Sequence, residues 1–151
     1  MKSFQFPLEK ALELRRKQLE AEEALYKREM AGLGAIDRRR AEIEAAGIRA
    51  EIQVREWSPI AAGDLSALGA YRLKVKADEA DLARKRLDAE RKLAEQKKVM
   101  LEARRRSKLL ERLRERRLEE WTAARAKELE EIAADSFLAR WDGAKETMEL
   151  E

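Results

Sequence analysis

Apolar residues recur along the first third of the chain at spacings of three, four or seven. They follow Pro7, which suits the first position of a helix because its missing N–H would have no partner there. Such spacing places apolar side chains on one stripe of a helix, as in coiled coils. It predicts a first helix from about residue 7 to about residue 57. The stripe comprises Leu8, Leu12, Leu19, Tyr26, Leu33, Ile36 and Ile43.

This stripe has polar interruptions. A strict heptad would place apolar residues at four positions that are charged, namely Arg15, Glu22, Glu29 and Arg40. Apolar residues lie next to or near three of these positions, at Leu14, Leu25 and Met30. We therefore expect a loose seam that shifts locally toward the apolar neighbours. Glycines at 32, 34 and 47 weaken the helix further, by up to about 1 kcal/mol each relative to alanine.

Helix breakers separate this segment from a much longer one. Residues 58–64 contain a proline and a glycine, and Asp64 is a candidate N-cap for the next helix. From Leu65 to about Trp141 there is no proline, which predicts a second helix over about 65–141. Asp142 and Gly143 are expected to end this helix, and residues 142–151 to form a frayed tail. A short connection makes two long helices antiparallel neighbours. The predicted fold is all-α: one long antiparallel two-helix coiled-coil hairpin over 1–151, with the second helix longer than the first.

The unequal lengths leave part of the second helix without a partner. With the apex of the hairpin near residue 60, Leu8 lies opposite roughly Leu113. About twenty-five residues beyond that point have no expected cover. Their apolar residues are Trp121, Leu129, Ile132, Phe137, Leu138 and Trp141, and an eleven-residue spacing joins Val99, Leu110, Trp121 and Ile132. Exposed apolar rows mark interaction surfaces. Two alternatives stay open: the end folds back as a third helix, or two copies pair their ends.

Composition supports a helical pair. Charged residues make up 43% of the chain, but 44% are hydrophobic and periodically spaced, which favours a coiled coil over a disordered chain. The chain contains no cysteine, so it forms no disulfide. Neither a secretory signal nor an uncharged apolar stretch of membrane-spanning length is visible, so we expect a cytoplasmic protein. The net charge of +3 is too small to indicate nucleic acid by itself.

Charge is distributed unevenly within the second helix. Residues 104–117 contain eight basic and two acidic residues, whereas residues 118–151 contain four basic and ten acidic ones. The basic residues Arg104, Lys108, Arg112 and Arg116 recur at every fourth position, so like charges adjoin on the helix. Glu111 with Arg114 and Arg112 with Glu115 have the spacing to offset them. The basic excess is therefore available to a charged partner, which it would help to orient.

Two other functions fit the sequence less well. Nucleic-acid binding is disfavoured because the acidic segment follows directly after the arginines and no aromatic residue is interleaved with them. Catalysis is disfavoured because the chain has no histidine, cysteine, glycine-rich phosphate loop or metal-ligand spacing. We expect a non-enzymatic protein without catalytic, metal or cofactor-binding residues and without a cofactor.

The two ends of the sequence resemble the FliJ family, the small coiled-coil component of the bacterial flagellar type III protein export apparatus. At the start, Phe4-Gln5-Phe6-Pro7-Leu8-Glu9 with Leu12, Leu14, Arg15 and Glu22-Glu23 is similar to the family's opening motif. Tyr71 and the later residues Lys108, Glu111, Leu113, Arg117, Glu120-Trp121 and Glu130-Glu131-Ile132-Ala133 also resemble the family pattern.

This resemblance implies a cytoplasmic stalk, peripheral to the inner face of the membrane at the flagellar base. The stalk would link the export ATPase ring to the cytoplasmic part of the export-gate membrane protein, and would also handle export chaperones. Implied ring contacts are Leu8, Leu12, Arg15, Arg112, Arg114, Arg116, Arg117 and Trp121. Implied gate contacts are Ile43, Tyr71 and Val75. The alternatives are the equivalent stalk of a virulence type III secretion system and a generic homodimeric coiled-coil scaffold.

Overall fold

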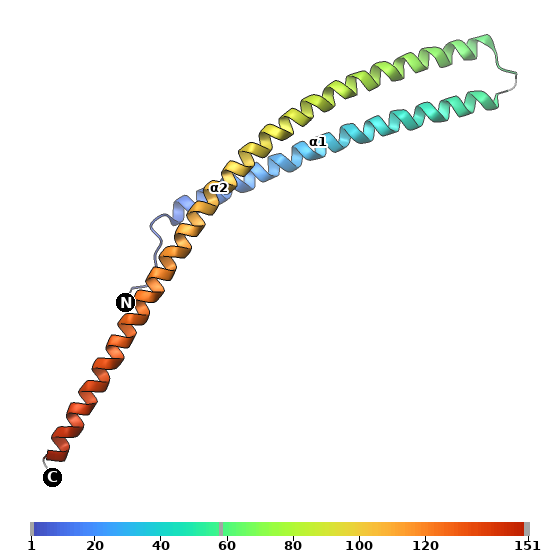
Figure 1. Cartoon of the computed structure of the whole chain (residues 1–151). Helices are drawn as coiled ribbons and strands as arrows, with labels where there is room; N and C mark the ends of the chain where they lie inside the picture. The colour runs from blue at the N-terminus through green and yellow to red at the C-terminus, as the bar shows by residue number, and fades with distance from the viewer. Residues whose placement is uncertain (1, 58, 150–151) are drawn as a thin grey trace. The chain divides into compact units, whose positions relative to one another are not determined.

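The computed structural model describes residues 2–57 and 59–149, which form two helices, α1 (Glu9–Glu56) and α2 (Ala62–Glu149) (Figure 1). No strand occurs among these residues. The two helices pack against each other and the second is the longer, so the predicted helical hairpin is confirmed. Ser58, at the start of the expected turn, and residues 150 and 151 of the expected tail lie outside the described residues.

Contacts divide the chain into two units, each containing part of both helices. The hairpin unit is Lys17–Arg104, and the end unit combines Met1–Arg16 with Arg105–Glu151.

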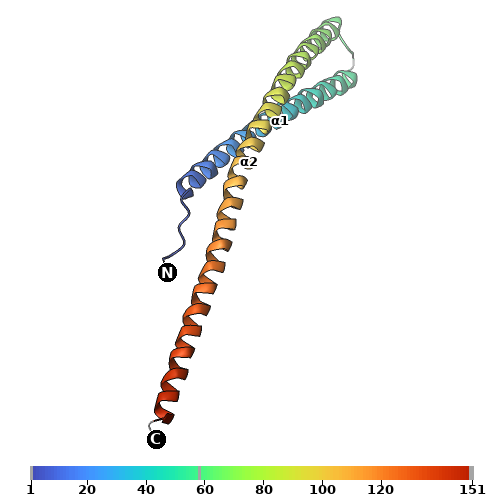
Figure 2. The same ribbon diagram turned by 60° about the vertical axis from the view of Figure 1, so that its left-hand side comes forward.

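Ion pairs define the register of the hairpin unit, in which α1 and α2 run antiparallel on either side of the connection (Figures 1 and 2). Arg72 Nε lies 2.9 Å from Glu51 Oε1, and Arg86 Nε lies 2.7 Å from Asp37 Oδ1. The residue numbers of both pairs add up to 123. Exposed ion pairs of this kind contribute at most about 1 kcal/mol each to stability, so they indicate the register of the hairpin but stabilise it little.

The seam of α1 keeps the heptad at three of its four polar positions, whereas the fourth, Arg40, is exposed. Glu22 and Glu29 are half-buried at seam positions, whereas Leu25 and Met30 are exposed, so the expected local shift of the seam is wrong. Long polar side chains tolerate such positions because their carbon stems pack while their charged ends reach water. Glu22 also has a partner across the seam, since the Gln96 side-chain amide donates to its backbone carbonyl and to its carboxylate.

The starts of both helices differ from the sequence prediction by a few residues. Helix α1 begins at Glu9 and not at Pro7, and the Phe6 carbonyl accepts a hydrogen bond from the Glu9 N–H at 3.1 Å. Helix α2 begins at Ala62, so Asp64 lies inside its first turn and is not the N-cap. The Asp64 carboxylate instead accepts a hydrogen bond from the Ala61 N–H at 3.2 Å, which satisfies an amide at the helix start.

The predicted end of the second helix near residue 141 is wrong, because α2 continues to Glu149. A single glycine in a helix costs about 1 kcal/mol, and Gly143 is followed by Ala144, Lys145 and Glu146, which form helix well. The Thr147 hydroxyl donates to the carbonyls of Gly143 and Ala144 within this last segment. The alternative in which the end folds back as a third helix is therefore also wrong.

Within the described residues, neither helix contains a stretch apolar enough and long enough to cross a membrane.

Candidate partner-binding surface of the end unit

An N-terminal segment, residues 2–8, covers one side of α2 in the end unit. Phe6 is buried, and the Phe4 ring lies 6.0 Å from the Trp121 ring, centroid to centroid, at an interplanar angle of 57°. Two guanidinium groups flank this pair: Arg114 lies 5.8 Å from the centre of Phe4 and Arg125 lies 5.3 Å from the centre of Trp121. These distances suit cation–π attraction, which is worth about 0.5–1 kcal/mol at exposed sites. Trp121 is thus half-buried, and the expectation that it lacks cover is wrong.

Beyond Trp121 this side of α2 is only partly covered, since Leu129 and Ile132 are each 55% exposed. A cavity of about 460 Å³ lies between the N-terminal segment and this side of the helix. The eleven-residue spacing predicts this side correctly for Leu110 and Trp121, which are half-buried, and for Ile132, which lines the cavity. Val99, in the hairpin unit, is exposed. The cavity is lined by Lys2, Ser3, Phe4, Trp121, Arg125, Glu128, Leu129 and Ile132.

The first turns of α1 complete the packing of the end unit. The Leu12 side chain is fully buried, at 0% exposure, and Ser107 of α2 is buried as well. Arg114 Nε lies 3.1 Å from Glu9 Oε2, and Arg16 Nε lies 3.2 Å from Glu111 Oε1. Glu111 and Arg114 were expected to pair within the second helix, and both pair with α1 instead.

The opposite side of α2 presents unpaired basic side chains. Lys108, Arg112 and Arg116 are exposed, and no ion pair or hydrogen bond joins them to any residue in the described ranges. Arg116 is nine positions beyond the buried Ser107, about two and a half turns, so the two side chains lie on opposite sides of the helix. We call Lys108, Arg112 and Arg116 the basic row. The unpaired state was expected for Lys108 and Arg116, whereas Arg112 was expected to pair with Glu115 and does not.

Other predicted ring contacts have partners within the protein. Arg114 is held by Glu9 and Phe4, and Arg117 lies 3.1 Å from Glu120. Arg15 is half-buried and also has a partner.

The remaining predicted contacts differ in exposure. Leu8 is exposed, but the Leu12 side chain is fully buried and cannot contact a partner in this conformation. The predicted gate contacts, Ile43, Tyr71 and Val75, are half-buried positions of the hairpin unit. The end unit thus brings the predicted ring residues together, while only some of them face outward.

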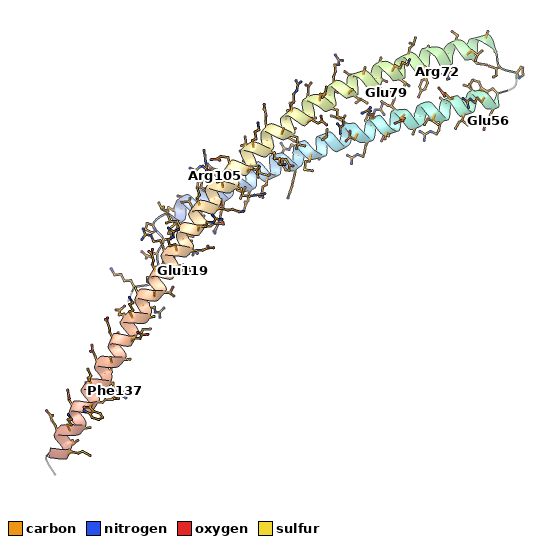
Figure 3. The ribbon with its side chains drawn as sticks, viewed as in Figure 1. Glu56, Arg72, Glu79, Arg105, Glu119 and Phe137 are labelled. Carbon is orange, nitrogen blue, oxygen red and sulfur yellow. The ribbon has the colours of Figure 1, made fainter. Side chains whose placement is uncertain are left out.

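The last turns of α2 carry exposed apolar side chains. Phe137, Leu138, Trp141 and Met148 are all more than half exposed. The Phe137 and Trp141 rings stack at 6.3 Å between centroids, and Lys145 Nζ lies 6.0 Å from the centre of Trp141. Figure 3 shows Phe137 on a stretch of α2 that no other described part of the end unit adjoins. We call Phe137, Leu138, Trp141 and Met148 the apolar row.

Sequence reasoning missed the roles of Phe4 and Arg125. The available signal was the Phe-x-Phe pattern before Pro7, since two aromatic residues outside a helix usually need a surface to bury them.

Nothing in the described residues groups three or more acidic side chains in a way that could hold a metal ion.

The surface of the end unit is charged and aromatic. Comparison of the chain with protein-family models, with curated proteins and with solved structures gives no match.

Proposed function

We propose that this protein is a non-enzymatic stalk of the flagellar type III export apparatus, which engages the export ATPase ring through its end unit. In this proposal it acts at the cytoplasmic face of the inner membrane. It links the ring to the export gate and accompanies export chaperones.

The observation that carries the proposal is the unpaired basic row. Three cations at successive turns of one helix, without an internal counter-charge, repel one another mildly at this spacing. An acidic partner surface would remove that repulsion and would orient the helix as it approaches. The fold adds support, because two continuous helices joined by a single short connection suit a rigid mechanical link between partners better than they suit an enzyme.

The exposed fractions of the side chains reduce the number of residues that could contact the ATPase ring. Arg112 and Arg116 are the strongest candidates, with Leu8 as an accessible apolar contact. Leu12, Arg114 and Trp121 act indirectly in this proposal, since they hold the N-terminal segment and α1 against α2. The gate-facing assignment of Ile43, Tyr71 and Val75 rests on the family resemblance alone.

The test is stimulation of a purified export ATPase by the full chain. The double variant Arg112→Glu and Arg116→Glu should keep its helicity, because both side chains are exposed and unpaired, and should lose the stimulation. The matched control is Lys97→Glu with Lys98→Glu, which makes the same charge change at two exposed positions of α2 in the hairpin unit. The control should stimulate normally. Equal stimulation by the Arg112 and Arg116 variant would contradict the proposal.

A further inference from the structure

The apolar row leaves a large part of its surface exposed to water. Its four members are separated by steps of one, three and seven residues, which keeps them near one side of α2. Trp141 is nine positions beyond Ile132, about two and a half turns, so the apolar row lies on the side of the helix opposite the N-terminal segment. Contiguous exposed aromatic surface of this kind marks a binding site for another protein.

The same side of α2 carries the basic row nearer the start of the end unit. Arg116 and Trp141 are twenty-five positions apart, about seven turns, so they point in the same direction. Leu109, exposed beside Lys108 and Arg112, adds an apolar residue to this part of the face. One continuous helical face therefore carries cations and a leucine at one end and aromatic residues at the other.

Net charge along this helix is complementary end to end. Residues 105–126 contain eight basic and four acidic residues, for a net charge of +4. Residues 128–149 contain two basic and seven acidic residues, for a net charge of −5. Two copies laid side by side in parallel would place like charges together, whereas an antiparallel pair places each basic segment against the acidic segment of the other copy. Opposite charge thus selects the orientation.

We propose that the end unit self-associates as an antiparallel pair of α2 helices related by a two-fold axis near residue 127. In this pair the Arg112 and Arg116 side chains of one copy lie level with Trp141 and Phe137 of the other. The contact occurs twice because the axis repeats it. Guanidinium groups stack well on aromatic faces, so the same residues supply both apolar burial and cation–π attraction.

Self-association would cover Arg112 and Arg116, which the proposed function assigns to the ATPase ring. A chain in this pair could not engage the ring through those residues. That consequence rests on the proposed function, whereas the pairing itself does not.

Sedimentation of the full chain over a range of micromolar concentrations tests the proposal. We expect a reversible dimer that weakens as salt is added, because the contact depends on opposite charges. The variant Phe137→Ala with Trp141→Ala should be monomeric over the same range. The matched control, Leu129→Ala with Ile132→Ala, removes apolar residues of similar exposure from the other side of the same helix and should leave the dimer intact. A monomeric natural chain, or equal effects of the two variants, would overturn the proposal.

Single cysteines test the orientation, since the chain has none of its own. An antiparallel pair brings position 127 of both copies together and separates the two copies of position 145. Oxidation should therefore join chains that carry Lys127→Cys and leave chains that carry Lys145→Cys unjoined. Efficient joining through position 145 would show parallel pairing and refute the proposed arrangement.

Discussion

Replacement of Leu12 by alanine should destabilise the end unit far more than replacement of Leu14, two positions away on the same helix. The Leu12 side chain is 0% exposed, whereas that of Leu14 is 56% exposed. Leucine loses three carbon atoms when it becomes alanine, and a buried carbon contributes about 0.8 kcal/mol. The transfer contribution at Leu12 is therefore about 2.4 kcal/mol, and buried Leu→Ala changes with a residual cavity cost about 2–5 kcal/mol.

Leu14 provides the matched control for this substitution. Less than half of its side chain is buried, so the same arithmetic gives about 1 kcal/mol, which the higher helix propensity of alanine partly offsets. Hydrogen exchange of the amides in residues 12–16 measures the free energy of local opening without assuming that the whole chain unfolds at once. We expect the opening free energy to fall by at least about 1 kcal/mol more for Leu12→Ala than for Leu14→Ala. Equal losses would refute the assignment of Leu12 to the packed side of α1.

Three further substitutions test separate parts of the structure. Gly47→Ala should raise the free energy of unfolding by about 0.5–1 kcal/mol, as measured by urea denaturation. A Cβ at this position meets no atom within 4 Å, and alanine favours helix. A lower free energy of unfolding would show that the two helices pack more tightly at Gly47 than described. Phe4→Ala should make Trp121 more accessible to a fluorescence quencher in a chain whose other tryptophans are phenylalanine, and unchanged quenching would contradict the stacking. The pKa of Asp81 lies below its usual value because Lys85 donates a hydrogen bond to the carboxylate and adds positive charge nearby. The contribution of ionised Asp81 to stability is therefore present above the pKa of the unfolded chain and is lost as the pH falls through the lowered pKa of the folded chain. Lys85→Met should raise that pKa in an NMR titration, and an unchanged value would remove Lys85 as the main cause.

The periodic pattern was sufficient to predict the two helices and their antiparallel order. Apolar spacing, a single proline-containing connection and the long proline-free stretch agree with one another, and tertiary packing follows the same pattern. The unpaired Arg116 was also predictable, since like charges recur there at four-residue spacing, whereas Arg112 was expected to pair with Glu115.

The sequence-based predictions were wrong where a signal from one or two residues competed with tertiary packing or with the helix propensity of neighbouring residues. Glu22 stays in the seam because Gln96 satisfies it, a partner that its own helix does not reveal. Gly143 lies in a continuing helix because the good helix formers that follow it, Ala144, Lys145 and Glu146, offset the cost of one glycine. Phe4 covers Trp121 although the two are far apart in sequence, and periodicity carries no information about a segment that is not itself periodic.

Site-specific cross-linking between the full chain and a purified export ATPase most directly tests the central claim, that the basic row of the end unit contacts the ring. A cysteine placed at position 112 lies within the basic row, and a cysteine at position 60 lies in the connection between the helices and is also exposed. With a thiol-directed photoreactive group, the account predicts a covalent product with the ATPase from position 112 and none from position 60. A product from position 60 alone, or no product from position 112 under conditions where the two proteins co-purify, would contradict it.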